Sequence, residues 1–355
     1  MAFLAVGCGA GTVERTSFRT GLPAAEGHLN LVAFPGYAEA GGSDPRVNWV
    51  TPFVRSTGCK VHVRTVRSST ELLDVVAHGR YDGVLSGGDV SRVLVGGREV
   101  APLNRNLIPN YARVYPALRR LQEGEYAVPH GREAPLLLWR SDLVRPGPRA
   151  VSALWAAQYG PKVAVYDSAM QIAEAALVLG NRNPYELDRG QFLAAVRLAA
   201  EQQAFVGSYW QDEVEAVADF TGGNAVAGLV PPRIADLLRH DQVPVRARYP
   251  GVSTGRIDVW MLLARARHPG CMYRWLDYIL SPKANAASAR FLGAAPATPA
   301  ACAYMDCGAV HAGDEAWWSR VALWQTPQHV CGDARGEVCA DWFEWSDAWA
   351  QIRSG

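Results

Sequence analysis

The chain has 355 residues, of which 49% are hydrophobic and 19% are charged, and this globular composition and length predict about two domains of about 150 residues each. Its 35 Lys and Arg and 34 Asp and Glu give a net charge of +1, which excludes the strongly basic surface typical of a nucleic-acid binder. No run of about 18 apolar residues occurs, so no segment is predicted to cross a bilayer.

The first residues resemble the end of a bacterial export signal. Met1 to Gly7 is mostly apolar and ends in small residues before Cys8, as in the lipobox of lipoproteins, although Ala5 stands where Leu is usual. We therefore expect Cys8 to carry lipid, and residues 1–28 to form a lipobox-like start and a flexible tether. The alternative is an N-terminal tail with an unmodified thiol.

Six further cysteines in a chain with export features indicate disulfides. Cys331 and Cys339 flank a short Gly-containing loop and are predicted to pair, and Cys302 is predicted to pair with Cys307. The alternative is a zinc site formed by Cys302, Cys307 and His311, but the second closely spaced pair typical of zinc sites is missing. We expect neither a metal nor a cofactor.

Short apolar segments alternate with amphipathic segments along most of the chain, which predicts an α/β fold with parallel strands covered by helices. Trp342, Trp345 and Trp349 lie at helical spacing and predict a C-terminal helix that buries this stripe. Strands are predicted at 29–34, 60–65, 83–86, 162–166, 225–230 and 256–264, and helices at 47–57, 69–78, 151–159, 168–179, 188–203, 212–221, 232–240, 271–280 and 282–292.

The segment 125–138 is extended and contains Pro129 and Pro135, which predicts a crossover between two lobes rather than a central strand. The later strand at 256–264 resembles material of the first lobe. We therefore expect lobe 1 to comprise residues 29–131 and 257–311, and lobe 2 to comprise residues 132–256 and 312–355, the last part being a Trp-rich helical region.

Several short strings, in this order, are similar to those of a known class of proteins. They are Phe34-Pro35-Gly36-Tyr37, Tyr81-Asp82-Gly83-Val84-Leu85-Ser86, Tyr126-Ala127-Val128-Pro129, Tyr166-Asp167-Ser168-Ala169, Gly255-Arg256-Ile257-Asp258 and Leu323-Trp324-Gln325. With them the chain resembles, from Leu29 to Arg353, the solute-binding proteins of ABC importers, and within that class it is similar to the spermidine/putrescine-binding proteins.

This resemblance implies a two-lobe, type II periplasmic-binding-protein fold with a hinge and a central ligand cleft. It implies a small-molecule ligand, and as partners a membrane permease and its cytoplasmic ATPase. We expect a monomer in an extracytoplasmic location, periplasmic or on the cell surface, which touches the membrane only through lipid at Cys8. A role in sensing rather than import is the alternative.

The resemblance also implies which residues meet the ligand. Phe34 and Tyr37 match an aromatic pair of the family, Ser86 matches a hydroxyl residue, Asp258 matches a carboxylate that meets an ammonium group, and Gln325 matches a polar residue near the ligand's far end. Gly87 is added because it permits close approach of the backbone. The candidate ligand-binding residues are Phe34, Tyr37, Ser86, Gly87, Asp167, Ser168, Gln171, Arg256, Asp258 and Gln325.

Four positions depart from the polyamine binders. Arg256 stands where the family typically has Trp, Arg132 stands where Trp is frequent, and Ser168 and Gln171 replace acidic residues. A cation site depends on carboxylates and aromatic faces, whereas guanidinium groups bind carboxylates or phosphates. We rank a polyamine-like cationic amine first and keep a zwitterionic or anionic ligand, bound through Arg132 and Arg256, as the alternative. Pairing of both guanidiniums with carboxylates at the rim is equally open.

Enzyme motifs are weak. Gly251 to Gly255 fits the G-x-S-x-G pattern of a hydrolase with Ser253 as nucleophile, but that serine must stand on a strand-to-helix turn, and a strand-like segment follows it here. We expect no catalysis. The chain has no phosphate-binding G-x-x-x-x-G-K-[ST] loop, so ATP hydrolysis would belong to a partner. Asp212, Glu213 and Glu215 begin a predicted helix and are expected to cap it and to be solvated, rather than to act as a catalytic acid and base.

Overall fold

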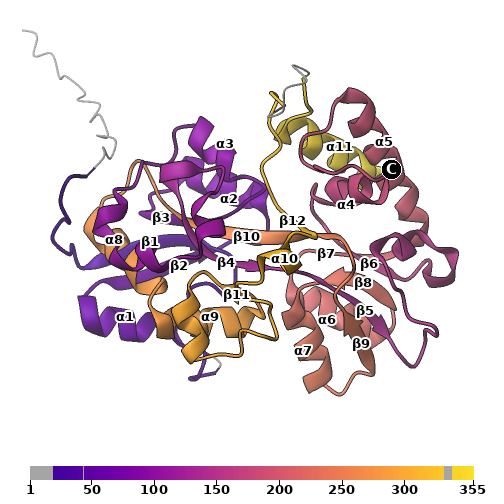
Figure 1. Ribbon diagram of the computed structural model, residues 1–355, viewed down its shortest axis with the longest axis horizontal. Coiled ribbons are helices and arrows are strands. Elements are labelled where there is room, and N and C mark those ends of the chain that lie inside the picture. The colour runs from indigo at the N-terminus through magenta and orange to yellow at the C-terminus, as the bar shows by residue number, and fades with distance from the viewer. Residues whose placement is uncertain (1–18, 43, 332–337) are drawn as a thin grey trace, which may run out of the picture.

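The computed structural model describes residues 19–42, 44–331 and 338–355, so Cys8, the predicted lipid attachment site, lies outside the described residues. Two α/β lobes lie side by side and are joined by crossing segments (Figure 1), which is the two-lobe arrangement of type II binding proteins. Among the described residues, none of the helices has the length and hydropathy needed to cross a membrane.

The strands and helices follow one another along both lobes. The strands are β1 (His28–Ala33), β2 (Lys60–Thr65), β3 (Gly83–Gly87), β4 (Val128–Glu133), β5 (Leu136–Arg140), β6 (Val163–Tyr166), β7 (Val206–Trp210), β8 (Ala227–Val230), β9 (Val245–Arg248), β10 (Ser253–Leu262), β11 (Ala295–Pro296) and β12 (Val321–Leu323). The helices are α1 (Val50–Thr57), α2 (Ser69–His78), α3 (Ser91–Gly96), α4 (Gln171–Val178), α5 (Arg189–Glu201), α6 (Glu213–Gly222), α7 (Pro232–His240), α8 (Pro269–Ile279), α9 (Pro282–Leu292), α10 (Glu315–Trp318) and α11 (Trp342–Ser354).

Each lobe is built on one sheet. The sheet of lobe 1 has the strand order β11-β4-β10-β3-β1-β2, and β12 pairs with the start of β10. The sheet of lobe 2 has the order β7-β6-β8-β5-β9. The chain passes between the sheets from β4 to β5 and from β9 to β10, and a third passage leads from β12 to α11. The predicted lobe boundaries at 131/132 and 256/257 therefore fall inside β4 and β10. The crossover predicted at 125–138 is present, but the prediction that this segment forms no central strand is wrong, because β4 and β5 each pair with a strand on both sides.

Most of the predicted elements are confirmed, and α2, α7 and α9 have the predicted bounds. The helix predicted at 151–159 is wrong, because this segment forms two 3-10 turns, Val151–Trp155 and Ala157–Tyr159. Its buried residues Val151 and Leu154 lie three apart, which suits the three-residue period of a 3-10 turn. The short strands β7 and β9 were not predicted.

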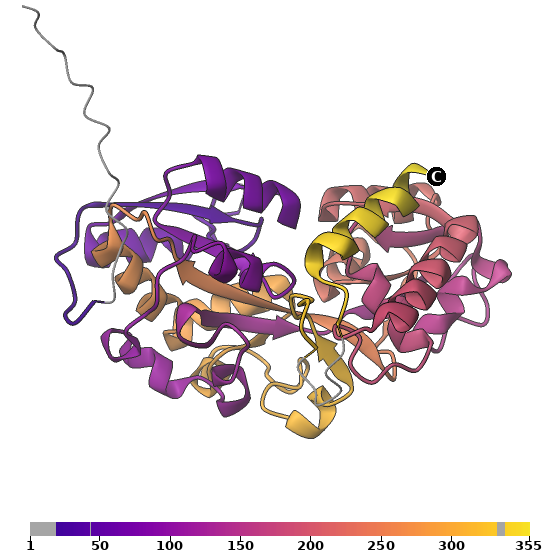
Figure 2. The same cartoon turned by 90° about the horizontal axis from the view of Figure 1, so that it is seen from above.

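The C-terminal helix α11 confirms the stripe prediction, since Trp342, Trp345 and Trp349 are all buried on it. Asp341 caps its start by accepting hydrogen bonds from the backbone N–H groups of Phe343 and Glu344. Figure 2 shows α11 along the side of lobe 2 that faces lobe 1. The last helix therefore forms part of the boundary between the lobes.

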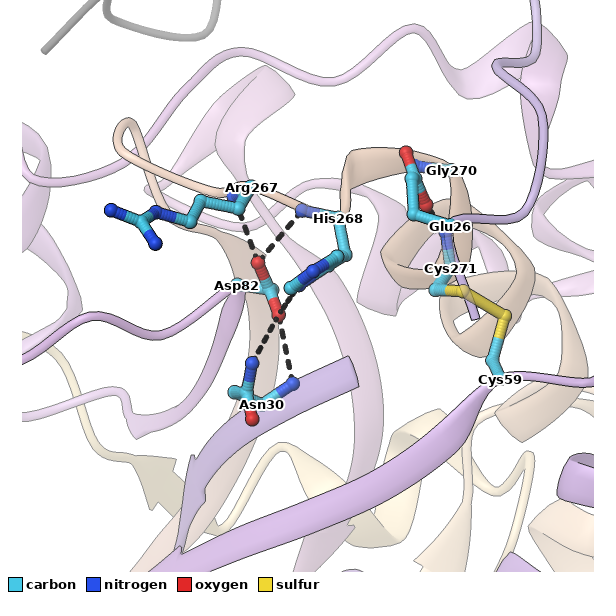
Figure 3. Close-up of polar contacts among 8 residues, drawn as sticks. All are labelled: Glu26, Asn30, Cys59, Asp82, Arg267, His268, Gly270 and Cys271. Carbon is cyan, nitrogen blue, oxygen red and sulfur yellow. Dashed lines mark hydrogen bonds and ion pairs between the residues drawn. A yellow bond between two sulfur atoms is a disulfide. The ribbon is translucent and has the colours of Figure 1, made fainter. Parts of the chain in front are cut away.

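One buried carboxylate holds three segments of lobe 1 together through hydrogen bonds (Figure 3). Asp82, which is only 1% exposed, accepts hydrogen bonds from the backbone N–H groups of Arg267 and His268, at 2.9 Å each, and from the backbone N–H of Asn30 at 2.8 Å. The ring of His268 lies 2.9 Å from its second oxygen. The contacts hold the start of β3 against β1 and the loop before α8.

Three disulfides join the remaining cysteines, and the two predicted pairs, Cys302–Cys307 and Cys331–Cys339, are confirmed. Cys302 and Cys307 therefore offer no thiolates to zinc. The third disulfide, Cys59–Cys271, links the start of β2 to α8 across 212 residues of sequence. Beside it, the Glu26 carboxylate accepts the N–H groups of Gly270 and Cys271 (Figure 3), so the segment before β1 is bound to lobe 1.

We predict that the Cys59–Cys271 disulfide contributes more to stability than Cys302–Cys307, because a cross-link removes more entropy from the unfolded chain when it closes a longer loop. The double variant Cys59→Ala/Cys271→Ala should lose about 3 kcal/mol more unfolding free energy than the control Cys302→Ala/Cys307→Ala. Urea denaturation monitored by fluorescence measures both. Equal losses would contradict the loop-length argument.

Candidate functional site

The floor of the cleft is built on β10. Residues two apart on a strand point to the same face, so Arg256 and Asp258 lie together. Arg256 stands opposite Glu133 of β4, and Asp258 stands opposite Gly87 of β3. The register of one antiparallel strand therefore gathers three charged groups at the boundary between the lobes.

The half-buried Arg256 and the buried Asp258 form an ion pair. The Nη2 atom of Arg256 lies 3.3 Å from the Oδ1 atom of Asp258, and the hydroxyl of Tyr37 donates a hydrogen bond to the other carboxylate oxygen. Burial, together with the nearby Asp258 carboxylate, raises the pKa of Tyr37 well above its usual value, so the hydroxyl remains a donor. The charge of Asp258 is thus compensated within the chain.

Aromatic rings surround this pair. The guanidinium carbon of Arg256 lies 5.6 Å from the ring centre of Phe34 and 5.5 Å from that of Trp324. From lobe 2, the ring of Tyr166 lies 4.6 Å from the ring of Trp210. Such faces attract cations, and here Arg256 itself occupies one such position.

Three cavities meet at this point. The cleft cavity, of about 210 Å³, is lined from lobe 1 by Phe34, Tyr37 and Arg67 and from lobe 2 by Glu213, among others. The helix cavity, of about 440 Å³, lies between the start of α2 and α11. The side cavity, of about 40 Å³, reaches into lobe 2. Tyr166 lines all three.

Carboxyl groups outnumber guanidinium groups along the two larger cavities. Their acidic lining residues are Asp89, Glu133, Asp167, Asp212, Glu213 and Asp347, and their basic lining residues are Arg67, Arg256 and Arg353. Burial raises the pKa of Asp89 to about 6 and that of Glu133 to about 8. A cation near these groups would favour their ionised forms.

An ion-pair cluster bridges the two lobes at the edge of the cleft cavity. Arg67 of lobe 1 lies 2.7 Å from the carboxylate of Asp212 and also pairs with Glu215, both at the start of α6. The expected capping is confirmed, since the Asp212 carboxylate accepts the backbone N–H of Glu215 at 3.0 Å. The expectation that the three carboxylates are solvated is wrong, because Asp212 and Glu215 pair with Arg67 and Glu213 pairs with Arg233. No motif marks these contacts, because Arg67 and Glu215 are 148 residues apart.

The structure brings most of the predicted ligand-binding residues to the cleft. Phe34, Tyr37 and Arg256 line the cleft cavity, Asp167 and Ser168 line the helix cavity, and Gln171 lines the side cavity. Ser86, Gly87 and Asp258 are buried in the floor beneath, where the Ser86 hydroxyl donates to the Gly87 carbonyl. Gln325 is exposed beside Trp324.

Arg132 is paired with a carboxylate, which is one of the two alternatives that the sequence left open, and it is not available to an anionic ligand. Its guanidinium donates two hydrogen bonds to the carboxylate of Glu315, at 3.0 and 2.6 Å, and lies 4.3 Å from the ring centre of Trp318. The side chain is 3% exposed, so it has no free face for an anion. Ser253 begins the strand β10 and stands on no strand-to-helix turn, which removes the basis for a nucleophile.

Sequence reasoning missed Glu133, Glu174, Trp210 and Trp324 as residues of the cleft region. Glu174 lies on α4 and accepts hydrogen bonds from the backbone N–H and the hydroxyl of Thr254 on β10. Trp324 donates from its ring nitrogen to the same hydroxyl, at 3.1 Å. These contacts join lobe 2 to the crossing strands. Only the family string that contains Trp324 could have drawn attention to it.

Comparisons with known proteins concern the family and the fold of the chain. A family model described as bacterial extracellular solute-binding protein matches residues 48–319. The PotD lipoprotein of Treponema pallidum shares 16% identity, with a TM-score of 0.77 over 92% of this chain and 100% of that one. The spermidine/putrescine substrate-binding protein PotD of Streptococcus pneumoniae also shares 16% identity, with a TM-score of 0.70 over 92% and 98%.

A third similar structure carries a different kind of ligand. MotA of Agrobacterium tumefaciens, solved in complex with glucopine, shares 15% identity, with a TM-score of 0.72 over 92% of this chain and 99% of that one. At these identities the likeness to solved structures concerns the fold. The fold is therefore shared by proteins with different ligands.

We predict that the stability of the ligand-free protein falls as pH rises through the range set by its buried carboxyl groups. Burial raises the pKa of Glu133 from 4.5 to about 8, so between these values the folded chain binds a proton that the unfolded chain has lost. The contribution of Glu133 to the free energy of unfolding is then largest below pH 4.5 and declines as the pH rises to 8. Asp89 and Glu174 act in the same direction at lower pH.

The variant Glu133→Gln should lose less unfolding free energy between pH 6 and 8 than the wild type does. Calorimetry across this range measures the difference, and Glu201→Gln at the exposed end of α5 serves as the control. Parallel pH profiles for Glu133→Gln and the wild type would show that Glu133 is ionised in the folded protein.

Proposed function

The chain belongs to the bacterial extracellular solute-binding protein family, and from this premise we propose that it captures a small amine, of the putrescine or spermidine type, in the cleft between its lobes. As the substrate-binding component of an ABC importer, it would deliver this solute to the membrane permease, whose transport a cytoplasmic ATPase drives.

The observation that carries the amine assignment is the excess of carboxyl groups along the cleft and helix cavities, next to several aromatic rings. Because Arg256 is held by Asp258, its charge is balanced within the floor. Of the other carboxyl groups, Asp167, Asp212 and Glu213 are paired with Arg353, Arg67 and Arg233, which leaves Asp89, Glu133 and Asp347 to attract an ammonium group. An ammonium group is favoured by such surroundings through charge and cation–π attraction, the latter worth about 0.5 to 2 kcal/mol for each ring.

The location of the protein is extracytoplasmic, as its family describes, and three disulfides suit an oxidising compartment. We further propose that Cys8 carries a lipid anchor. The segment before β1 is bound to lobe 1 through Glu26 and through Arg274, which donates to the Pro23 carbonyl. Such an anchor would hold lobe 1 to the membrane. We propose that the protein meets the permease as a monomer.

A zwitterionic or anionic solute is the second candidate, and one feature of Arg256 favours it. The Nε atom of this guanidinium is buried without a hydrogen-bond partner among the described residues, and its one ion pair uses Nη2. A carboxylate of the solute could bind the remaining donors. The glucopine bound by MotA shows that proteins of this fold accept solutes other than polyamines.

A thermal-shift titration separates the two candidates. Putrescine and spermidine should raise the melting temperature of the wild-type protein, because a ligand that binds only the folded state stabilises it. The anions glutamate and phosphate should have no effect, and neither should the zwitterions taurine and γ-aminobutyrate. Stabilisation by the anions alone would refute the amine assignment, while the family role in solute capture would stand.

Replacing Asp258 tests the ion pair in the floor. In Asp258→Asn the charge of Arg256 is no longer balanced, so we expect the affinity for an amine to fall by about 2 kcal/mol or more, about 30-fold. Isothermal titration calorimetry measures this, with Asp236→Asn on the exposed face of α7 as the control. Unchanged affinity would mean that Asp258 has no influence on the ligand.

A further inference from the structure

We propose that the side cavity between the lobes, formed by the rings of Tyr166, Trp210 and Trp324 and by the carboxyl groups of Glu133 and Glu174, receives a primary ammonium end of the solute. The inference rests on the proposed function, since it places the amine group of the cleft ligand. It names the side cavity as the place where the amine group binds, and it specifies that this group is a primary amine.

The side cavity adjoins the cleft cavity. Glu133, Tyr166, Trp210, Pro231 and Arg256 line both, so a solute in the cleft can extend one end past these residues. The floor pair lies at this junction, with the charge of Arg256 matched by Asp258. A chain of methylene groups in the cleft would thus carry its terminal ammonium toward the carboxyl groups of lobe 2.

The aromatic walls of the side cavity suit a cation. The rings of Tyr166 and Trp210 lie 4.6 Å apart, and the ring of Trp324 lies 6.2 Å from that of Tyr166 with only 15° between their planes. Trp324 is fixed by its hydrogen bond to the Thr254 hydroxyl. Because Arg256 already lies over the ring of Trp324, the rings of Tyr166 and Trp210 are the faces that can attract an ammonium group in this cavity.

Glu174 supplies the acceptor. It is only 3% exposed, and its Oε1 atom accepts both hydrogen bonds from Thr254, at 2.9 and 2.6 Å. Its Oε2 atom has no hydrogen-bond partner among the described residues. A buried acceptor without a partner is costly, and an ammonium group that donates to Oε2 would remove this cost. This oxygen has almost no exposed surface in the ligand-free protein, so an ammonium group in the side cavity reaches it only when the surrounding side chains move.

Glu133 completes the site from the other side. It is 8% exposed and stands on β4 opposite Arg256, at the junction of the side and cleft cavities. Two carboxyl groups on different lobes, Glu133 from the lobe 1 sheet and Glu174 from α4, thus border one small cavity. A cation between them would hold the lobes together, which couples its binding to closure.

The size of the side cavity restricts the amine. A volume of about 40 Å³ accommodates about three water-sized groups, at roughly 10 to 15 Å³ each. A primary ammonium with one or two methylene groups fits this space, whereas a trimethylammonium group, with four carbons around its nitrogen, does not. The cavity should therefore select primary amines over methylated ones.

Glutamine substitutions test the site. In Glu174→Gln and in Glu133→Gln, the affinity for putrescine or spermidine, whichever binds the wild type more tightly, should fall at least tenfold in isothermal titration calorimetry at pH 7.5. The matched control is Glu123→Gln. Glu123 is equally buried, at 3% exposure, but it bonds to Ser91 in lobe 1 and lines none of the three cavities, so its replacement should leave the affinity unchanged.

A second measurement needs no variant. The wild type should bind the amine at least tenfold more tightly than its fully methylated analogue, in which each terminal amine is a trimethylammonium group of the same charge. Equal affinity for the two compounds, or unchanged amine affinity in both folded Gln variants, would overturn the site while the proposed function stands. Failure of the wild type to bind any amine would overturn the proposed function and, with it, this site.

Discussion

The ion pair of Arg256 and Asp258 is the interaction on which the rest of the cleft depends. Removing two charges from water costs free energy that their mutual attraction only partly recovers, so such a pair is rarely a net source of stability. Loss of either partner, however, leaves an uncompensated buried charge. The residues around the pair must therefore satisfy its remaining hydrogen-bonding atoms. Tyr37 does so by donating a hydrogen bond to the second oxygen of Asp258.

The same strand also joins the floor to the hinge. Two residues before Arg256, Thr254 donates to Glu174 of α4 and accepts from the ring nitrogen of Trp324. Gly255 pairs with Leu323 of β12. A rotation of lobe 2 about these crossing segments would move Glu174 relative to the floor pair, because one continuous backbone carries both sets of contacts. The hydrogen bonds of Thr254 thus join lobe 2 to the strand that carries the floor pair.

Sequence reasoning succeeded where the signal is local. The spacing of apolar residues fixed α2, α7 and α9, and the stripe of Trp342, Trp345 and Trp349 predicted α11. The resemblance to the binding-protein family predicted that Arg256 and Asp258 lie at the cleft. Local sequence patterns did not predict contacts between residues far apart in the chain, since no periodicity links Glu174 to Thr254 or Arg67 to Asp212. Those contacts depend on how the lobes are placed against each other.

Strand register explains why two similar arginines have different surroundings. Arg132 and Glu133 are neighbours on β4, so their side chains point to opposite faces of the sheet. Arg132 stands opposite Ile257 and is covered by Glu315 and Trp318, whereas Glu133 stands opposite Arg256. A shift of one residue would have exchanged these faces. The observed register brings one guanidinium to the cleft instead of two, and because Asp258 balances it, the remaining carboxyl groups determine the sign of the charge that a solute meets.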